Sequence, residues 1–220
     1  MTAVKRLSLS PLLLETGVVA IVRGGSGEHL HSVCTTLIDS GVVCLEITTN
    51  TAGCWDEVPR LARNFGSKIE LGMGTVLSPA QVRRAANAGA TFVVAPNVDL
   101  AVGAAAAELG LRWYPGAATP TEILNAWNAG ATAVKVFPAS DLGGPSFLKS
   151  IAAPLDFIPL LPTGGIGIDS ITSYLRAGAI SVGVGSPLMG DTLTGGDLDG
   201  LRDRARRVLT ATTDGRRASE

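Results

Sequence analysis

The order of apolar and polar residues along the chain repeats one pattern: an amphipathic stretch, a glycine, and a short apolar run rich in β-branched residues. Four copies are clear: SGVVCLEIT from Ser40, AGATFVVAP from Ala88, AGATAVKVFP from Ala129 and AGAISVGVGS from Ala177. Each glycine stands where the end of a helix favours a left-handed residue, and the apolar run follows within a few positions. Each copy therefore predicts the end of a helix followed by a strand. The four glycines are Gly41, Gly89, Gly130 and Gly178.

Apolar runs between these copies raise the number of predicted strands to eight. The predicted strands lie near 18–23, 43–49, 69–75, 91–95, 112–116, 133–138, 157–162 and 180–185. Two of the intervening amphipathic segments open with Ser-Pro or Thr-Pro, a favourable pair for the N-cap and first turn of a helix. This alternation predicts an α/β fold with parallel strands, and eight strands favour a (βα)8 TIM barrel. An open doubly wound sheet is the alternative, although no GxGxxG motif follows the first strand.

The length of 220 residues fits one domain, and we expect residues 1–220 to form it, beginning with a short N-terminal helix. A flexible C-terminal tail is expected over about 211–220. The N-terminal apolar stretch is interrupted by Ser10, Pro11 and Glu15 before it reaches the length of a signal peptide. No run approaches the roughly 20 apolar residues that a membrane-spanning helix needs.

The amino-acid composition and net charge indicate which class of ligand to expect. Hydrophobic residues make up 46% of the chain and charged residues 17%, which suits buried parallel strands and argues against disorder. The net charge is -1 and no basic cluster occurs, so neither a nucleic acid nor a membrane surface is an expected partner. A small-molecule ligand is expected.

The number and spacing of the cysteines and histidines bear on the redox compartment and on metal binding. Cys34, Cys44 and Cys54 have no CxxC spacing, which predicts reduced packing thiols in a cytoplasmic protein. His29 and His31 are the only histidines, and their spacing puts them on different sides of a helix. We interpret both as surface residues, and we expect neither a metal ion nor another cofactor.

Lys135 is the lysine with an unusual setting. In AVKVFP, Lys135 and Phe137 share one face of the predicted strand, and Val134 and Val136 share the other. If the valines face the helices, the lysine points into the barrel, where loss of hydration favours a neutral amine. A neutral amine can attack a ketone, and the resulting iminium accepts electrons when a carbon–carbon bond breaks or forms. A structural ion pair with an interior carboxylate is the alternative.

Glu46 is the candidate partner of this lysine. In CLEITTN, Cys44, Glu46 and Thr48 share one face, and Leu45 and Ile47 share the opposite, apolar face. An inward carboxylate would either keep the amine protonated as an ion pair or move protons during imine formation and at the carbon next to the imine. Schiff-base chemistry requires such a proton carrier.

Two polar residues at predicted strand ends are candidates for binding anions. Thr75 follows the third strand and would donate to a carboxylate, or would simply cap the next helix. Arg23 ends the first strand and would form a bidentate clamp on a carboxylate or phosphate, or would lie exposed at the surface.

Two glycine-bearing turns are candidates for binding phosphate. PTGGI contains Gly164 and Gly165 after the seventh strand, and GVGSP contains Gly185 and Ser186 after the eighth. Barrel enzymes commonly bind phosphate in the loops after these two strands, through backbone N–H groups. Glycines that only form turns are the alternative at each place.

In this order along the chain, LEITTNT, GMGTVLSP, VAPN, YPGAATPTE, VKVFPAS, PTGGI and VGVGSPL resemble motifs of the 2-keto-3-deoxy-6-phosphogluconate (KDPG) and 4-hydroxy-2-oxoglutarate (KHG) aldolases. The resemblance extends from about Val18 to Leu188. It implies a class I aldolase, typically a homotrimer, that cleaves a 2-keto-3-deoxy-6-phosphosugar acid to pyruvate and glyceraldehyde 3-phosphate.

The same resemblance implies a role for each matching residue. Lys135 would be the Schiff-base lysine and Glu46 the general acid/base, and Thr75 would help to bind the pyruvate carboxylate. The remaining substrate-binding positions, which would shape the pocket and hold the phosphate, are Pro96, Phe137, Thr163, Gly164, Gly165, Gly185 and Ser186.

Asn50 departs from the family's pattern. Many phosphogluconate-type members have an arginine four residues after the catalytic glutamate, where this chain has asparagine. Together with AIVRGG and VAPNV, this asparagine is similar to the branch that acts on the epimer 2-keto-3-deoxy-6-phosphogalactonate, and Arg23 would replace the missing arginine. The alternatives are a main activity on 4-hydroxy-2-oxoglutarate, a phosphosugar isomerase in which Lys135 only neutralises charge, and a catalytically silent barrel.

Overall fold

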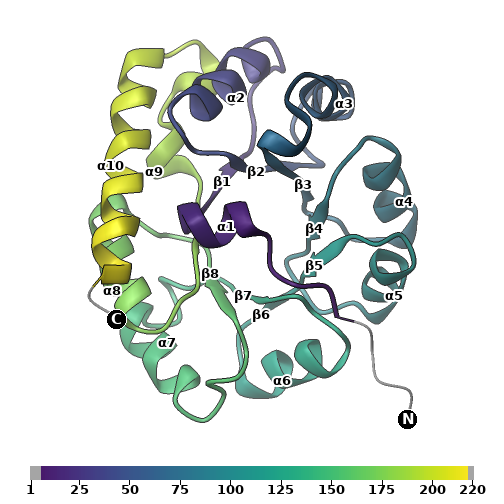
Figure 1. Ribbon diagram of the computed structural model, residues 1–220, viewed down its shortest axis with the longest axis vertical. Coiled ribbons are helices and arrows are strands. Elements are labelled where there is room, and N and C mark those ends of the chain that lie inside the picture. Colours follow the sequence, from purple (N-terminus) through teal and green to yellow (C-terminus); the bar gives the residue numbers. More distant parts are fainter. Residues whose placement is uncertain (1–5, 218–220) are drawn as a thin grey trace.

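Parallel strands surrounded by helices form the α/β core of the computed structural model, which describes residues 6–217 (Figure 1). The strands are β1 (Val18–Val22), β2 (Cys44–Thr48), β3 (Glu70–Gly74), β4 (Phe92–Val94), β5 (Arg112–Tyr114), β6 (Gly116–Ala117), β7 (Val134–Val136), β8 (Leu160–Pro162) and β9 (Val182–Val184). The α-helices are α1 (Pro11–Thr16), α2 (Leu30–Asp39), α3 (Cys54–Phe65), α4 (Pro79–Asn87), α5 (Leu100–Glu108), α6 (Pro120–Asn128), α7 (Gly144–Ala152), α8 (Ile171–Arg176), α9 (Ser186–Met189) and α10 (Leu198–Arg217). Short 3-10 helices are η1 (Gly66–Lys68), η2 (Ile168–Ser170) and η3 (Thr192–Thr194).

The strands form two parallel sheets. Six strands pair in the order β5-β4-β3-β2-β1-β9, and three pair in the order β6-β7-β8. On one side the sheets are separated only by Pro115, which lies between β5 and β6. On the other side, isolated parallel bridges join Leu160 to Ala179 and Thr163 to Gly183, so β8 lies next to β9.

The fifth predicted strand is interrupted. The sequence predicts one strand over 112–116, whereas the structure has β5 and β6 on either side of Pro115. Proline has no N–H to donate to a ladder, so it interrupts regular pairing. Its carbonyl still accepts a hydrogen bond from the N–H of Lys135 at 2.9 Å. Each of the other seven predicted runs contains one strand.

Helix ends follow the predicted pattern. The four glycines of the repeated units have φ values of 90°, 91°, 98° and 101°, the left-handed conformation expected after a helix. Ser78 caps α4 by accepting a hydrogen bond from the N–H of Gln81. Thr119 and Glu122 form a capping box at the start of α6.

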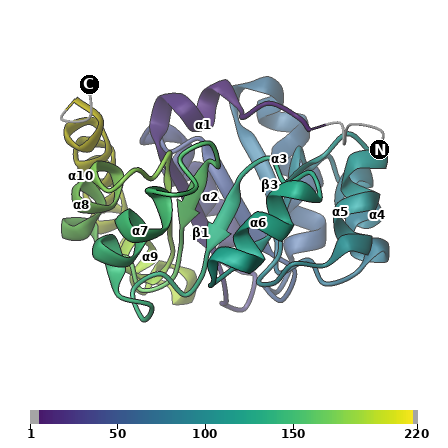
Figure 2. The ribbon, with the colours of Figure 1, turned by 90° about the horizontal axis from the view of Figure 1, so that it is seen from below.

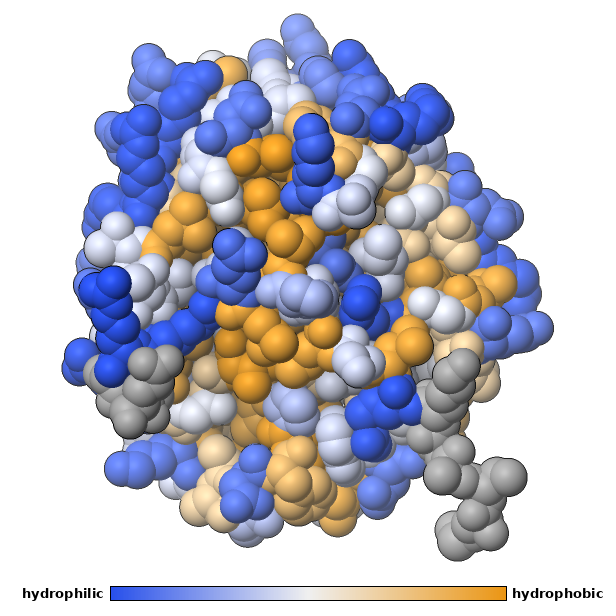
Figure 3. All heavy atoms as spheres, in the orientation of Figure 1, coloured by the Kyte–Doolittle hydropathy of each residue, from blue (hydrophilic) through white to orange (hydrophobic). Residues whose placement is uncertain are grey.

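Helix α1 lies across the amino-terminal ends of the strands, as both ribbon views show (Figures 1 and 2). Its Leu13 is buried in an interior cluster with Val19, Cys44, Phe92, Val94, Tyr114, Ala133 and Leu161. Burial raises the pKa of the Cys44 thiol to about 12 and also raises the pKa of the Tyr114 hydroxyl. In Figure 3, apolar side chains gather near the middle of this face and polar side chains surround them. The interior is therefore apolar at this end.

The C-terminal tail expected over about 211–220 is helical as far as it is described. Helix α10 continues through residue 217, with Thr212 and Gly215 buried, and residues 218–220 lie outside the described residues. A Cβ on Gly215 would come within 2.7 Å of the Leu175 side chain, so a small residue lets α10 approach α8 closely. Over 211–217 the expectation of a flexible tail was wrong, because Gly215 lets this part of α10 pack against Leu175 of α8.

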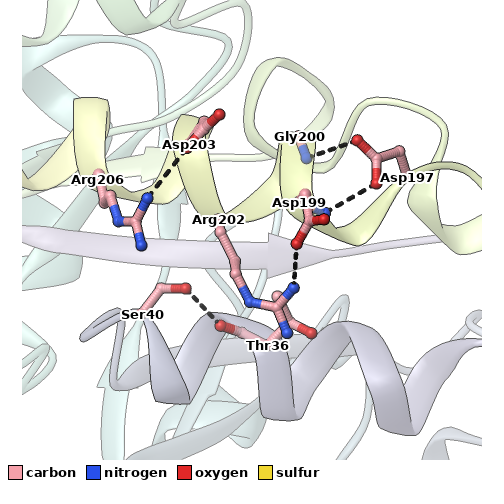
Figure 4. Close-up of polar contacts among 8 residues, drawn as sticks. All are labelled: Thr36, Ser40, Asp197, Asp199, Gly200, Arg202, Asp203 and Arg206. Carbon is pink, nitrogen blue, oxygen red and sulfur yellow. Dashed lines mark hydrogen bonds and ion pairs between the residues drawn. The ribbon is translucent and has the colours of Figure 1, made fainter.

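Polar contacts stabilise the start of α10 (Figure 4). The Asp197 carboxylate accepts hydrogen bonds from the N–H groups of Asp199 and Gly200, each at 2.9 Å. These backbone donors hold the pKa of Asp197 below its usual value. Arg202 pairs with Asp199 at 2.6 Å, and a second pair with the same spacing follows one turn later. The mostly polar helix thus begins with a cap and local ion pairs.

The cysteines agree with the sequence interpretation, and the histidines agree with it in part. All three cysteines are free and buried. The side chains of His29 and His31 are only about one-third exposed, and His31 Nδ1 lies 2.7 Å from Glu57 Oε1 on the adjacent helix α3. Helix α3 therefore covers His31 in part, while both histidines still reach the surface. None of the helices within residues 6–217 is long and apolar enough to span a membrane.

Candidate functional site

A cavity of about 550 Å³ opens where β1, β7, β8 and β9 end. Parallel strands bring their carboxyl ends to one edge, so residues distant in sequence meet there. Eight of the eleven predicted site residues line this cavity: Arg23, Lys135, Phe137, Thr163, Gly164, Gly165, Gly185 and Ser186.

Lys135 lies in the middle of β7 and is only 4% exposed. Val134 and Val136 are buried in the main core, so the lysine faces the opposite way, into the cavity. Within residues 6–217 its Nζ atom forms no ion pair, and it lies 4.9 Å from the centroid of the Phe137 ring. The arrangement contradicts the alternative of a structural ion pair.

Glu46 is 2% exposed and lies on the inward face of β2. Its Oε1 atom is buried without a hydrogen-bond partner among the described residues. Gly74 on the adjacent strand β3 provides the space for the carboxylate, because a Cβ at this glycine would overlap it. Glu46 pairs in register with Ile21, which lines the cavity, although Glu46 itself does not. A buried acceptor without a partner is costly, so this carboxylate is available for hydrogen bonding or proton transfer.

Thr75 and Arg23 meet at the same end of the strands. Arg23 is exposed, lines the cavity and donates from Nη2 to Thr75 Oγ1 at 3.1 Å. Thr75 has a φ of 58°, a positive value that no other non-glycine among the described residues has. This left-handed conformation costs a β-branched residue on the order of 1–2 kcal/mol. The cap of α4 is Ser78, so Thr75 is not the helix cap that the sequence left open.

Both glycine-bearing turns reach the cavity. Gly164 and Gly165 have φ values of 95° and 70°, and a Cβ at Gly164 would lie 3.1 Å from the Phe137 ring. Only glycine fits this combination of positive φ and close approach without strain. Gly185 precedes α9, and Ser186 is the first residue of that helix. The backbone N–H groups of two turns are thereby near one cavity.

Comparison with known proteins identifies the family. The model of the KDPG and KHG aldolases matches residues 10–203. The chain belongs to the KDPG and KHG aldolase family. A probable 2-dehydro-3-deoxy-6-phosphogalactonate aldolase of Rhizobium meliloti (strain 1021) is 36% identical over 207 residues, covering 94% of this chain and 95% of the relative.

Other members of the KDPG and KHG aldolase family agree with this match. The KHG/KDPG aldolase of Escherichia coli (strain K12) is 32% identical over 199 residues, covering 90% of this chain and 93% of the relative. A solved structure of native KDPGal superposes with a TM-score of 0.85 at 29% identity, covering 95% of this chain and 98% of that chain.

Three of the eleven predicted site residues do not line the cavity of this family member: Glu46, Thr75 and Pro96. Pro96 is exposed and does not line it, and the Pro96 carbonyl instead packs against Gly116, where a Cβ would overlap it. Asn50 is also exposed. Thr75 is outside the lining as well, but its hydrogen bond to Arg23 connects it to the cavity.

A cavity segment that the sequence pattern did not indicate follows β9. Met189, Asp191, Leu193 and Thr194 line the cavity from α9, η3 and the connection between them. No motif marks this segment, and its only sequence signal is its position just after the last strand, where barrel enzymes build their sites.

Proposed function

We propose that this chain is a class I aldolase that cleaves a 2-keto-3-deoxy-6-phosphosugar acid to pyruvate and glyceraldehyde 3-phosphate. The observation that carries the proposal is the buried amine of Lys135, which lines the cavity and forms no ion pair within the described residues. An amine without a carboxylate partner is available to attack a carbonyl.

The chemistry follows from the amine. The Nζ lone pair adds to the C2 ketone, and the carbinolamine loses water to give an iminium. When a base removes the C4 hydroxyl proton, the C3–C4 bond breaks, its electron pair moves into the iminium to give an enamine, and glyceraldehyde 3-phosphate leaves. Protonation of the enamine at C3 and hydrolysis then release pyruvate and regenerate Lys135.

Glu46 is our candidate for moving these protons. Its carboxylate is inward and has a buried oxygen without a partner among residues 6–217, so accepting a proton or a hydrogen bond would not break an existing contact. A positioned carboxylate of this kind contributes general acid/base catalysis at the carbinolamine, the C4 hydroxyl and C3.

The two ends of the substrate carry negative charge, and the cavity offers separate groups for each. We assign the pyruvate carboxylate to Thr75, and the phosphate to Arg23 and the turns of Gly164, Gly165, Gly185 and Ser186. Thr163 and Phe137 would line the space between the ends, and Pro96 would shape its rim.

We also propose the galactonate-type epimer as the preferred substrate. Asn50 stands where phosphogluconate-type members have arginine, while Arg23 lines the cavity. The relative with 36% identity carries the phosphogalactonate name.

The experiment is to measure kcat/KM for both phosphorylated epimers while following pyruvate. Pyruvate release from the galactonate-type substrate with the higher kcat/KM is expected. Conversion without pyruvate would indicate an isomerase, preference for 4-hydroxy-2-oxoglutarate would indicate the other family activity, and no turnover would indicate a silent barrel.

The two sheets and the subunit assembly extend the proposal to the whole molecule's architecture. We infer that Pro115 and the β8–β9 bridges connect the two sheets into one eight-stranded (βα)8 barrel that assembles as a homotrimer, as is typical of the family. Light scattering is expected to give about three times the 22.5 kDa chain mass, and a monomer mass would contradict the trimer. The three buried free thiols suit a reducing cytoplasm.

Replacing Arg23 with Ala is expected to raise KM for the phosphorylated substrate by about tenfold or more, the effect of losing a charge-assisted hydrogen bond. Imine formation with pyruvate, trapped with borohydride, should remain detectable. Arg207 is a matched control, because it is exposed on α10 and pairs with Asp169 away from the cavity. An unchanged KM for Arg23→Ala would show that this arginine does not contact the substrate.

A further inference from the structure

Residues 48–51 (TTNT), which begin two positions after Glu46, contact Thr75 and both chain neighbours of Arg23. Thr49 makes the first connection. Its Oγ1 donates to the carbonyl of Thr75 at 2.8 Å, and its N–H donates to the carbonyl of Gly74 at 2.8 Å. The strained backbone of Thr75, with φ of 58°, is thus held on both sides by one residue.

Thr51 makes the second connection. It is 3% exposed, and its Oγ1 accepts from the N–H of Gly24 at 3.1 Å and donates to the carbonyl of Val22 at 3.3 Å. Its hydroxyl also contacts that of Thr48 at 2.8 Å, so it remains tied to β2. The residues on both sides of Arg23 are therefore fixed by this one hydroxyl.

We propose that Thr49 and Thr51 are positioning residues, Thr49 for Thr75 and Thr51 for Arg23. The turn that follows β2, the strand of the proposed acid/base Glu46, would thereby also position two side chains that receive the substrate's charges. This inference rests on the proposed function of the site and extends it to two residues that do not line the cavity.

The physical reason lies in the strain at Thr75. A non-glycine residue keeps a left-handed backbone only when its surroundings impose it. Without the Thr49 hydroxyl, the Thr75 carbonyl loses its donor, and the backbone can relax toward a negative φ that turns Oγ1 away from Arg23. Arg23 has no comparable strain, but Thr51 accepts from the part-buried N–H of Gly24 and donates to the buried carbonyl of Val22 on either side of it.

Because the two threonines reach different residues, their removal should have separable effects. Thr49→Val is expected to raise the pyruvate concentration needed for half-maximal borohydride trapping on Lys135 by about fivefold, the value of one lost hydrogen bond. Thr51→Val is expected to leave that concentration unchanged and to raise KM for the phosphorylated substrate by about fivefold. In both variants kcat should stay within about twofold of the original, since neither residue contacts the reacting atoms.

Serine variants test whether the hydroxyl groups themselves are responsible. Thr49→Ser and Thr51→Ser keep the hydroxyl and should restore the original values, which a role in packing alone would not predict. Thr35→Val is the matched control, because its hydroxyl bonds only within α2, and it should change neither value. Thermal melts identify any variant that fails to fold, in which case its serine counterpart carries the comparison.

Three results would overturn the positioning roles: equal effects of both valine variants on pyruvate trapping, no effect of either, or serine variants that behave like valine. Absence of trapping in the unaltered protein is a different outcome, because it would contradict the Schiff base on Lys135 and hence the proposed function.

Discussion

Lys135→Met is expected to lower kcat/KM for aldol cleavage by at least about 10⁴-fold, because the covalent intermediate needs the amine and no other group can replace it. Borohydride treatment in the presence of pyruvate should add mass to the unaltered protein on Lys135 and none to the variant. Mass spectrometry of proteolytic fragments locates the adduct.

Loss of the fold would not explain this result. Lys135 has no ion-pair partner in the described part of the chain, so replacing it with an apolar side chain of similar length leaves no charge unpaired. Such replacements of buried charged groups are commonly neutral or stabilising, and the urea midpoint should stay the same or rise. Lys149→Met, on an exposed face of α7, is the control and should keep full activity. A Lys135→Met protein that still cleaves the substrate would refute the Schiff base.

The inward direction of Lys135 could be predicted because β-strands have a strict period of two. Once the flanking valines are assigned to the core, the lysine has only one other side to occupy. The same local logic predicted the glycine helix ends and the Ser78 and Thr119 caps, which depend on a few neighbouring residues. Such features need no knowledge of distant contacts.

Features that depend on contacts between distant residues were not predicted from the sequence. The break at Pro115 could have been anticipated from its missing N–H, but the last turns of α10 are ordered by the close approach of Gly215 to α8, which no local pattern reports. The cavity wall from α9 and η3 likewise depends on how the segment after β9 folds back over the strand ends.

In the candidate site, too, some features could be predicted locally and others depend on distant contacts. Residue types and strand positions indicated Lys135 and Glu46, yet the space that Gly74 leaves for the carboxylate follows from the register of β2 with β3. The hydrogen bond between Arg23 and Thr75 joins side chains 52 positions apart, and it depends on the left-handed backbone of Thr75. A sequence shows which side chains are candidates, but the register decides which of them meet.

Glu46→Gln is expected to lower kcat by about 10²- to 10⁴-fold, the usual contribution of a general acid/base. The amide has nearly the shape of the carboxylate but cannot carry protons between the carbinolamine, the C4 hydroxyl and C3. Exchange of the pyruvate methyl protons in deuterated water, followed by NMR, isolates the step at C3 and should slow by a similar factor. Borohydride should still trap the pyruvate imine after long incubation, because Lys135 is intact.

The fold should again be unaffected, since Glu46 Oε1 has no hydrogen-bond partner among residues 6–217 and a neutral amide is cheaper to bury than a carboxylate. The matched control is Glu57→Gln, a buried carboxylate on α3 that pairs with His31 and lies away from the cavity. That control should lose stability by about 1–3 kcal/mol and keep its exchange rate. If Glu46→Gln exchanged the methyl protons as fast as the unaltered protein, another group would have to move the proton at C3, and the unpartnered oxygen beside Gly74 would need a different explanation.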